Sequence, residues 1–185
     1  LTVDVNLYYT TGRIYSGYFY LPAEGAPWFF VKRPNGLAGD HVEYIRKPEQ
    51  MAELFAFYGL EMPEKLLLEA DELTYNDYIR LQKIFNPKET GNATAMMREL
   101  RRIKTPYEIE MFRISAERHA KTYAEIPECF RPGMTDLEFQ YEIEKRMRKN
   151  GSIGLFRAFG ANMDIFMGSL LAGENAGEPS PFDFA

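Results

Sequence analysis

Two helix-start signals constrain the second half of this 185-residue chain more than any other feature. Residues 105–108 (TPYE) and 135–138 (TDLE) each place a threonine three residues before a glutamate. This is the pattern of a capping box, in which each side chain bonds the other residue's backbone N–H. We therefore predict two long helices, the first weakened at Pro127 and the second ended by Gly151. Their apolar faces consist of Ile109, Phe112, Ala116, Ala120 and Tyr123 in the first helix and Phe139, Ile143 and Met147 in the second.

The first half of the chain alternates between strand-like and helix-like segments. Residues 4–10 (DVNLYYT) and 27–32 (PWFFVK) are rich in aromatic and β-branched residues, and we predict both to be strands. Residues 66–68 form a short apolar run that suits a buried strand. Apolar residues at helical spacing predict a helix over 48–58, and a threonine cap predicts another over 74–85. The alternation predicts an α/β layer structure.

A polar segment divides these two halves. Residues 86–92 (NPKETGN) contain Pro and Gly and are typical of an exposed link, so we predict an amino-terminal domain over 1–92 and a second, truncated domain over 93–185. The length fits one domain and part of another. Two strand-like segments, 153–159 and 163–171, follow the long helices.

Composition excludes several classes of protein. The net charge of -5 argues against a nucleic-acid partner, and the basic run 98–104 is interpreted as a solvated helix end. No apolar run approaches the ~18 residues that span a bilayer, so we expect no membrane insertion. The single cysteine, Cys129, cannot form an internal disulfide and lacks a clear activating base, which favours a reducing cytoplasm and a structural thiol.

Four segments carry a resemblance to one family. Residues 100–109 (LRRIKTPYEI) are similar to the LR-x-IK-T/S-x-x-E-I segment of prolidases, Xaa-Pro aminopeptidases and creatinases. Residues 131–138 (RPGMTDLE) resemble the PGMTE-x-E turn of the same superfamily, and residues 172–180 (AGENAGEPS) resemble its SG-x-NA-x-x-PH segment near the active site. Residues 4–12 (DVNLYYTTG) resemble its amino-terminal domain, so the likeness covers most of the chain.

The resemblance implies an α/β amino-terminal creatinase-like domain followed by an incomplete α+β pita-bread domain. It also implies a metallohydrolase that cleaves a peptide or related C–N bond. In the family, two aspartates, one histidine and two glutamates hold two divalent metal ions, which activate the attacking water. Manganese, cobalt or zinc is expected in a full-length protein that keeps these ligands. All five positions would lie beyond Ala185, so no metal ligand is assigned here and the chain alone is predicted to be inactive.

Two residues are candidate site residues. Ser180 stands where the family motif has a histidine, and a serine hydroxyl cannot shuttle protons near neutral pH as an imidazole does. A shifted alignment, a subgroup with altered hydrolase chemistry and a noncatalytic binding protein on the same scaffold all remain open. Arg157 is a candidate for binding a substrate carboxylate through a bidentate fork, against the alternative of a structural ion pair or solvated position.

The remaining candidates are interpreted as structural or as contact residues. Asp164 and Asp183 are separated by loops without a nearby histidine, so they are not predicted to be metal ligands. His119 is expected to be a packed or surface helical residue.

The aromatic run 28–30 (WFF), together with the resemblance, predicts a homodimer that acts on a peptide or small-molecule substrate. Leu1 is not an initiator methionine and Ala185 follows no helix stop, so both ends are expected to be truncated.

Overall fold

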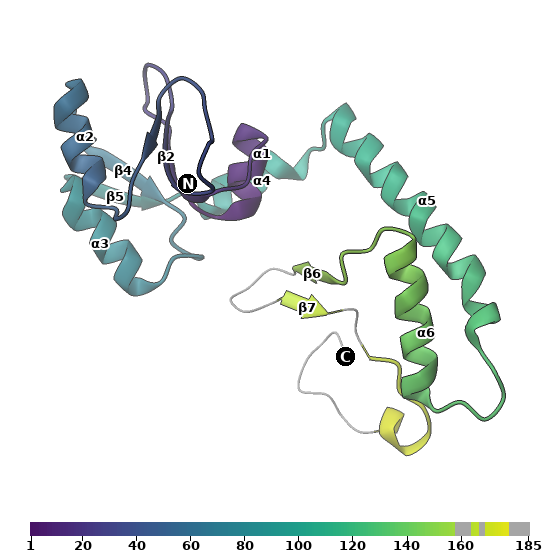
Figure 1. Ribbon diagram of the computed structural model, residues 1–185. Coiled ribbons are helices and arrows are strands. Elements are labelled where there is room, and N and C mark those ends of the chain that lie inside the picture. Colours follow the sequence, from purple (N-terminus) through teal and green to yellow (C-terminus); the bar gives the residue numbers. More distant parts are fainter. Residues whose placement is uncertain (158–163, 167–168, 178–185) are drawn as a thin grey trace. The chain divides into compact units, whose positions relative to one another are not determined.

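The computed structural model describes residues 1–157, 164–166 and 169–177 (Figure 1). The chain divides into two compact units, Leu1–Ile103 and Lys104–Ala185.

The first unit continues past residue 92, where the sequence predicted a domain boundary. Helix α4 (Thr94–Arg102) follows that position directly, and its Thr94 and Met97 are both buried within the unit. The polar composition of 86–92 therefore does not mark the end of the compact unit. A compact unit is defined by contacts within this chain and need not coincide with a domain. The domain limits 1–92 and 93–185 therefore stay predictions.

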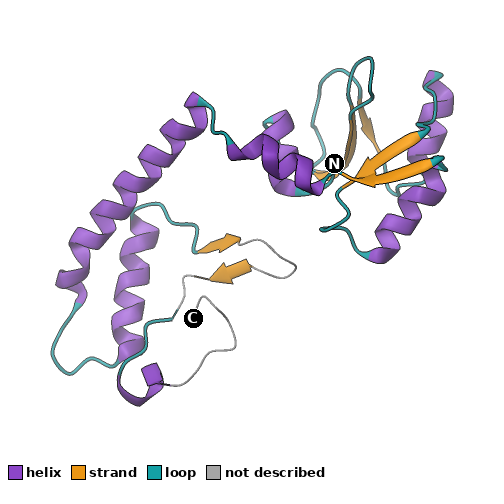
Figure 2. Cartoon of the chain, turned by 180° about the vertical axis from the view of Figure 1, so that it is seen from behind, coloured by secondary structure: helices purple, strands orange, loops and turns teal. Residues whose placement is uncertain are grey.

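Strands and helices alternate through the first unit, which is the α/β arrangement that the sequence predicted (Figure 2). Strands β1, β2 and β3 form one sheet in that order, with β2 antiparallel to β1 and parallel to β3. Strands β4 and β5 form a separate parallel pair. The elements are α1 (Asp4–Thr11), β1 (Ser16–Tyr20), β2 (Trp28–Arg33), β3 (Val42–Tyr44), α2 (Gln50–Tyr58), β4 (Lys65–Leu68), α3 (Tyr75–Phe85), β5 (Glu89–Asn92) and α4.

Helix α1 occupies the segment 4–10, which we predicted to be a strand, and that prediction is wrong. The helix ends at Gly12, which adopts a left-handed φ of 69° and donates its N–H to the carbonyl of Tyr8. Its inward side buries Asn6 and Leu7. The buried carboxylate of Glu69, which is distant in sequence, accepts the backbone N–H groups of the residues just before the helix. These contacts outweigh the modest strand preference of the aromatic and β-branched residues.

Strand β5 lies inside the segment 86–92, which we predicted to be an exposed link. Its four residues pair in parallel register with β4, from Lys65 opposite Glu89 to Leu68 opposite Asn92. The ladder satisfies backbone groups that a free link would leave to water. The Asn92 side chain also accepts the N–H of Ala70 at 3.2 Å and of Thr94 at 2.9 Å. Long-range pairing, which local composition does not encode, makes this polar segment a strand.

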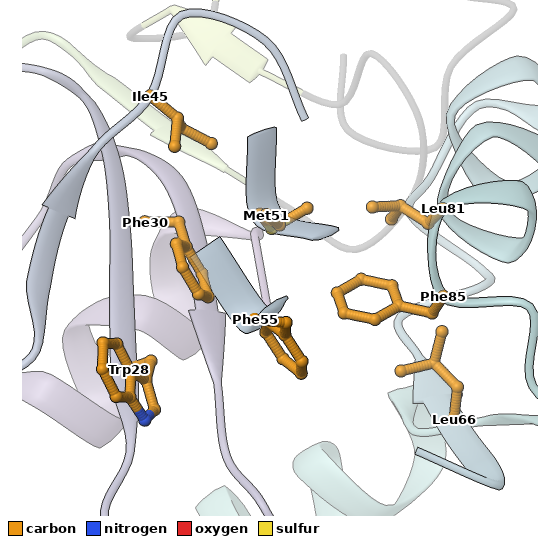
Figure 3. Close-up of a cluster of buried hydrophobic side chains, with 8 residues drawn as sticks. All are labelled: Trp28, Phe30, Ile45, Met51, Phe55, Leu66, Leu81 and Phe85. Atoms are coloured by element: carbon orange, nitrogen blue, oxygen red, sulfur yellow. The ribbon is translucent and has the colours of Figure 1, made fainter. Parts of the chain in front are cut away.

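Aromatic side chains dominate the larger core of the first unit. Phe55 of α2 lies 4.9 Å from the ring of Tyr20 and 5.4 Å from that of Phe85, centroid to centroid. Figure 3 shows eight buried side chains of this core, among them Phe55 of α2 and Phe85 of α3. The cluster consists of Trp28, Phe30, Ile45, Met51, Phe55, Leu66, Leu81 and Phe85. A second cluster consists of Leu7, Tyr15, Phe19 and Val31.

The second unit begins with the two predicted helices, α5 (Pro106–Cys129) and α6 (Asp136–Lys149). Both capping boxes are present, formed by Thr105 with Glu108 and by Thr135 with Glu138. Helix α5 continues through Pro127, where weakening was predicted, and ends two residues later. Strands β6 (Leu155–Arg157) and β7 (Asp164–Phe166) and the short 3-10 helix η1 (Gly173–Gly177) complete the described unit.

Polar contacts, more than apolar burial, join α5 to α6. Arg146 of α6 lies 3.3 Å from the carboxylate of Glu125, and Asn150 donates to Thr122 at 3.1 Å. The Cys129 thiol is buried between the helices and has no disulfide partner. In contrast, the apolar face predicted for α5 is open to solvent in this structure, with Phe112 59% exposed and Tyr123 69% exposed.

Candidate functional site

The two candidate site residues predicted from the sequence, Arg157 and Ser180, lie at or beyond the edge of the described structure. Ser180 and Asp183 lie outside the described residues. Arg157 is the last residue of β6, and the antiparallel register with β7 sets its backbone opposite that of Asp164. His119 is exposed on α5, in agreement with the structural interpretation. The catalytic and binding roles of Ser180 and Arg157 therefore stay predictions.

The segment that leads toward Ser180 is held against the first turns of α6. Asp136 Oδ2 accepts the backbone N–H of Ala172 at 3.2 Å and the side-chain amide of Asn175 at 3.5 Å. One turn further on, Gln140 Oε1 accepts the N–H of Leu170 at 3.0 Å. Two side chains of one helix thus anchor residues 169–177, which include 172–177, the described part of the predicted active-site segment.

Local sequence places these two side chains on the same side of α6. Residues four apart in a helix lie one above the other, so Asp136, Gln140 and Glu144 form a row. Gln140 Nε2 donates to Glu144 Oε1 at 2.7 Å, which leaves the Gln140 oxygen directed toward Leu170. In this row, Asp136 and Gln140 supply acceptor oxygens to the segment, and Glu144 orients the Gln140 side chain.

Asp136 is a carboxylate whose charge is stabilised at this position. The N–H of Ala172 contributes most to holding the pKa of Asp136 below its ordinary value, followed by the N–H of Leu137 and the amide of Asn175. The charge is also favourably placed at the positive end of the helix dipole. Asp136 therefore acts as an ionised acceptor at neutral pH.

A second polar centre lies in the first unit around Glu69, which is only 2% exposed. Its Oε2 accepts the backbone N–H groups of Thr2 at 2.5 Å and Val3 at 3.0 Å, and its Oε1 accepts from Asn6 Nδ2 at 2.6 Å. All three donors belong to the start of α1 or the residues just before it. Glu69 therefore joins the end of β4 to α1, and this arrangement is a structural anchor.

An open depression of about 670 Å³ lies in the first unit near the end of β2. Its lining includes Asp4, Ser16, Arg33 and Asn35. Lys32 also lines it, but its ammonium lies 4.8 Å from the ring centre of Tyr18 and donates to that hydroxyl. The depression has no paired acid and base, so its chemistry does not indicate a reaction.

The described residues do not form a metal centre. Among them, no group of three or more His, Cys, Asp and Glu side chains converges on one point. A dinuclear site requires several such ligands around both ions. The residues present in this part of the chain therefore do not fit a resident metal pair, and we derive no catalytic step from one.

Sequence reasoning missed Asp136, Gln140 and Glu69 as anchoring residues. In the sequence, Asp136 belongs to a helix-start pattern and stands four residues before Gln140, but this spacing does not identify their partners. The partners lie far away in sequence: Leu170 is 30 residues from Gln140, and Thr2 is 67 residues from Glu69. Only the folded chain identifies such pairs.

Known proteins are similar to this chain in sequence and in fold. An uncharacterized peptidase of Staphylococcus haemolyticus is 24% identical over 194 residues, covering 97% of this chain and 50% of its own length. The Xaa-Pro dipeptidase of Bacillus anthracis superposes with a TM-score of 0.66 at 22% identity, covering 82% of this chain and 44% of its own. For the prolidase of Pyrococcus furiosus the TM-score is 0.62 at 22% identity, with coverages of 84% and 50%.

These similarities define the fold class of the chain: a creatinase-like α/β domain, followed along the sequence by part of a pita-bread fold. The chain belongs to the creatinase/prolidase family, because the model of the Creatinase/Prolidase N-terminal domain matches residues 1–103. It spans about half the length of the relatives that it matches. Among the described residues, no helix has both the length and the apolar composition to cross a bilayer.

Proposed function

We propose that this chain is the amino-terminal part of a prolidase-like or Xaa-Pro aminopeptidase-like metallohydrolase. The complete protein would cleave a peptide or related C–N bond at a dinuclear centre of manganese, cobalt or zinc. The main support is the alignment of 97% of the chain with half of a peptidase. The order of the motifs within it, from 100–109 through 131–138 to 172–180, further supports the proposal.

The chain by itself is proposed to be inactive. A metal-activated water requires ligands that converge on the ions, and the described residues supply no such cluster. This chain would instead contribute substrate-facing groups. Arg157 would bind a substrate carboxylate, and Ser180 would occupy the place of the histidine in the family motif.

An activity assay tests this proposal directly. The full-length protein, in which this chain is followed by the half that its relatives possess, would be incubated with Xaa-Pro dipeptides and added manganese, cobalt or zinc. We expect metal-dependent release of proline from the full-length protein and none from residues 1–185. Absence of hydrolysis by a folded full-length protein with every metal would contradict the proposal.

Ser180 favours a second candidate function, a noncatalytic binding protein on the same scaffold. Serine lacks a group that titrates near neutral pH, so it cannot replace histidine in proton transfer. The test is Ser180→His in the full-length protein, with Ser180→Ala as the matched variant. A gain of peptidase activity in Ser180→His, but not in Ser180→Ala, would indicate that the wild-type protein lacks the proton transfer that a histidine supplies. Loss of activity in Ser180→Ala would show that the serine itself takes part in hydrolysis.

We further propose that the protein is a cytoplasmic homodimer. Exposed aromatic side chains in the first unit, such as Phe57 at 78% exposure, offer apolar area for a partner. Light scattering at micromolar concentration should give twice the mass of one chain. A monomer mass throughout this range would contradict the dimer.

A further inference from the structure

We propose that Asp136 and Gln140 are positioning residues that hold segment 169–177 in place, and that the rate of the complete enzyme depends on this hold. The holding contacts stand on geometry alone. Their catalytic consequence rests on the proposed peptidase function. Neither residue would touch the substrate, since both act on the backbone or amide of the segment.

The segment depends on these contacts because it has little burial of its own. Residues 171–177 are exposed, and the 3-10 helix η1 buries no residue. Leu171, which carries the largest apolar side chain of this stretch, is 50% exposed. A stretch with few buried apolar contacts opens locally at low free-energy cost. Hydrogen bonds from α6 are therefore the main described restraint on its position.

The contacts fall at the place where the segment turns. Ala172 donates to Asp136, and the next residue, Gly173, which is the first residue of η1, adopts a left-handed φ of 62°. Asn175 returns its side-chain amide to the same carboxylate oxygen. Asp136 thus contacts residues on both sides of the turn.

This role is separable from the capping of α6. Thr135 and Glu138 form the capping box without Asp136. Asp136 Oδ1 accepts the N–H of Leu137 at 2.8 Å, while Oδ2 serves the segment. Gln140 lies beyond the cap altogether. Substitution at Gln140 therefore tests the segment separately from the start of the helix, whereas substitution at Asp136 leaves the capping box but also removes the acceptor of the Leu137 N–H.

Residue-resolved hydrogen exchange of the 185-residue chain tests the holding contacts. Asp136→Ala should speed exchange of the Ala172 amide by about threefold or more, and Gln140→Ala should do the same for Leu170. Asp136→Asn, which keeps one acceptor oxygen, should have a smaller effect. Lys145→Ala is the control, because this exposed α6 residue contacts Glu142 and not the segment. Unchanged exchange at both amides in the two alanine variants would overturn the proposal.

Asp136→Ala could also unfold helix α6, which would raise exchange throughout the helix. In that case Gln140→Ala decides whether the proposal holds. Alanine is a strong helix former, and of the two contacts to the segment this substitution removes only the one with Leu170. Faster exchange at Leu170 with α6 still protected supports the proposal. Unchanged exchange at Leu170 refutes it.

The catalytic consequence is tested in the full-length protein. Asp136→Ala should lower kcat for a Xaa-Pro dipeptide by about tenfold with a smaller change in KM, since misplacement of groups near the reacting bond costs rate. Asp136→Asn should partly restore kcat, and Lys145→Ala should match the wild type. A wild-type rate in Asp136→Ala, despite faster exchange, would refute positioning. An inactive wild-type enzyme would refute the proposed function, while the exchange data still decide the holding contacts.

Discussion

At the scale of single residues, Glu69 shows how one buried carboxylate organises an element that is distant in sequence. Its two oxygens accept three hydrogen bonds around the start of α1. Among the described atoms, Asn6 Oδ1 has no hydrogen-bond partner although it is buried. The anchor is thus satisfied at Glu69 and incomplete at Asn6.

Glu69→Gln is expected to lower the free energy of unfolding by about 1–2 kcal/mol, because neutral hydrogen bonds replace charge-assisted ones. The loss stays modest because Asn6 can turn its amide so that the unpaired oxygen accepts from the new glutamine. Glu69→Ala removes this possibility and should cost about 3 kcal/mol or more. Urea unfolding measures both, with Glu61→Gln as the control, because Glu61 is an exposed carboxylate of the same unit. Equal stabilities of Glu69→Gln and Glu69→Ala would contradict the role of Asn6.

A second residue-scale prediction concerns Glu49, which joins α2 to α3. Arg80 binds both of its carboxylate oxygens, at 2.6 and 2.8 Å, and this pairing lowers the pKa of Glu49 from 4.5 to about 2. A depressed pKa means that the pair stabilises the fold fully above about pH 4.5 and loses this effect as the pH falls toward 2.

Glu49→Gln should therefore unfold at a lower urea concentration than the wild type at pH 7, with the two converging as the pH approaches 2. The effect at pH 7 should be small, since both side chains are accessible to solvent. Glu53→Gln is the matched control, because Glu53 is an exposed carboxylate in the first turn of the same helix. A difference between wild type and Glu49→Gln that persists unchanged at pH 2 would contradict the prediction.

At the scale of elements, the helices of the second unit follow from local sequence. Each capping box uses residues only three apart, so the signal and the structure coincide. The same locality explains why α2, α3, β2 and β4 were predicted correctly. The helix α1 and the strand β5 were not, because each depends on partners elsewhere in the chain.

Thr105→Ala should destabilise α5 by about 1 kcal/mol, because the Glu108 N–H loses its hydroxyl acceptor and the Glu108 carboxylate loses the hydroxyl donor, while the backbone N–H of residue 105 still donates to Glu108. Thr105→Ser keeps the hydroxyl and should lie close to the wild type. Thr135→Ala should have a similar effect on α6. Far-UV circular dichroism during urea unfolding measures the loss. Equal destabilisation by Thr105→Ser and Thr105→Ala would show that the cap hydroxyl is not the cause.

At the scale of the whole molecule, burial is divided unequally between the two units. All the buried hydrophobic side chains recorded for the described residues belong to Leu1–Ile103, except Cys129. The helices of the second unit are joined mainly by polar contacts, and the apolar face of α5 is exposed. Hydrophobic burial is the main favourable term in folding, so the second unit should be less stable.

We expect unfolding in two steps, with the second unit melting at a lower urea concentration. Trp28, the single tryptophan, is 7% exposed in the first unit, so its fluorescence should report only the later step. Circular dichroism should report both. Phe55→Ala should cost about 3–5 kcal/mol and shift only the fluorescence step. Coincident fluorescence and dichroism curves would show that the units unfold together.

The sequence by itself determined the family, the α/β character of the first half and the two capped helices of the second. These features rest on contiguous motifs and on contacts between residues a few positions apart. Only the tertiary structure decided that residues 4–10 form a helix, that 89–92 form a strand and that Asp136 and Gln140 hold segment 169–177. The reason is physical: buried carboxylates, parallel ladders and side-chain anchors join residues tens of positions apart, and local propensity carries no record of such partners.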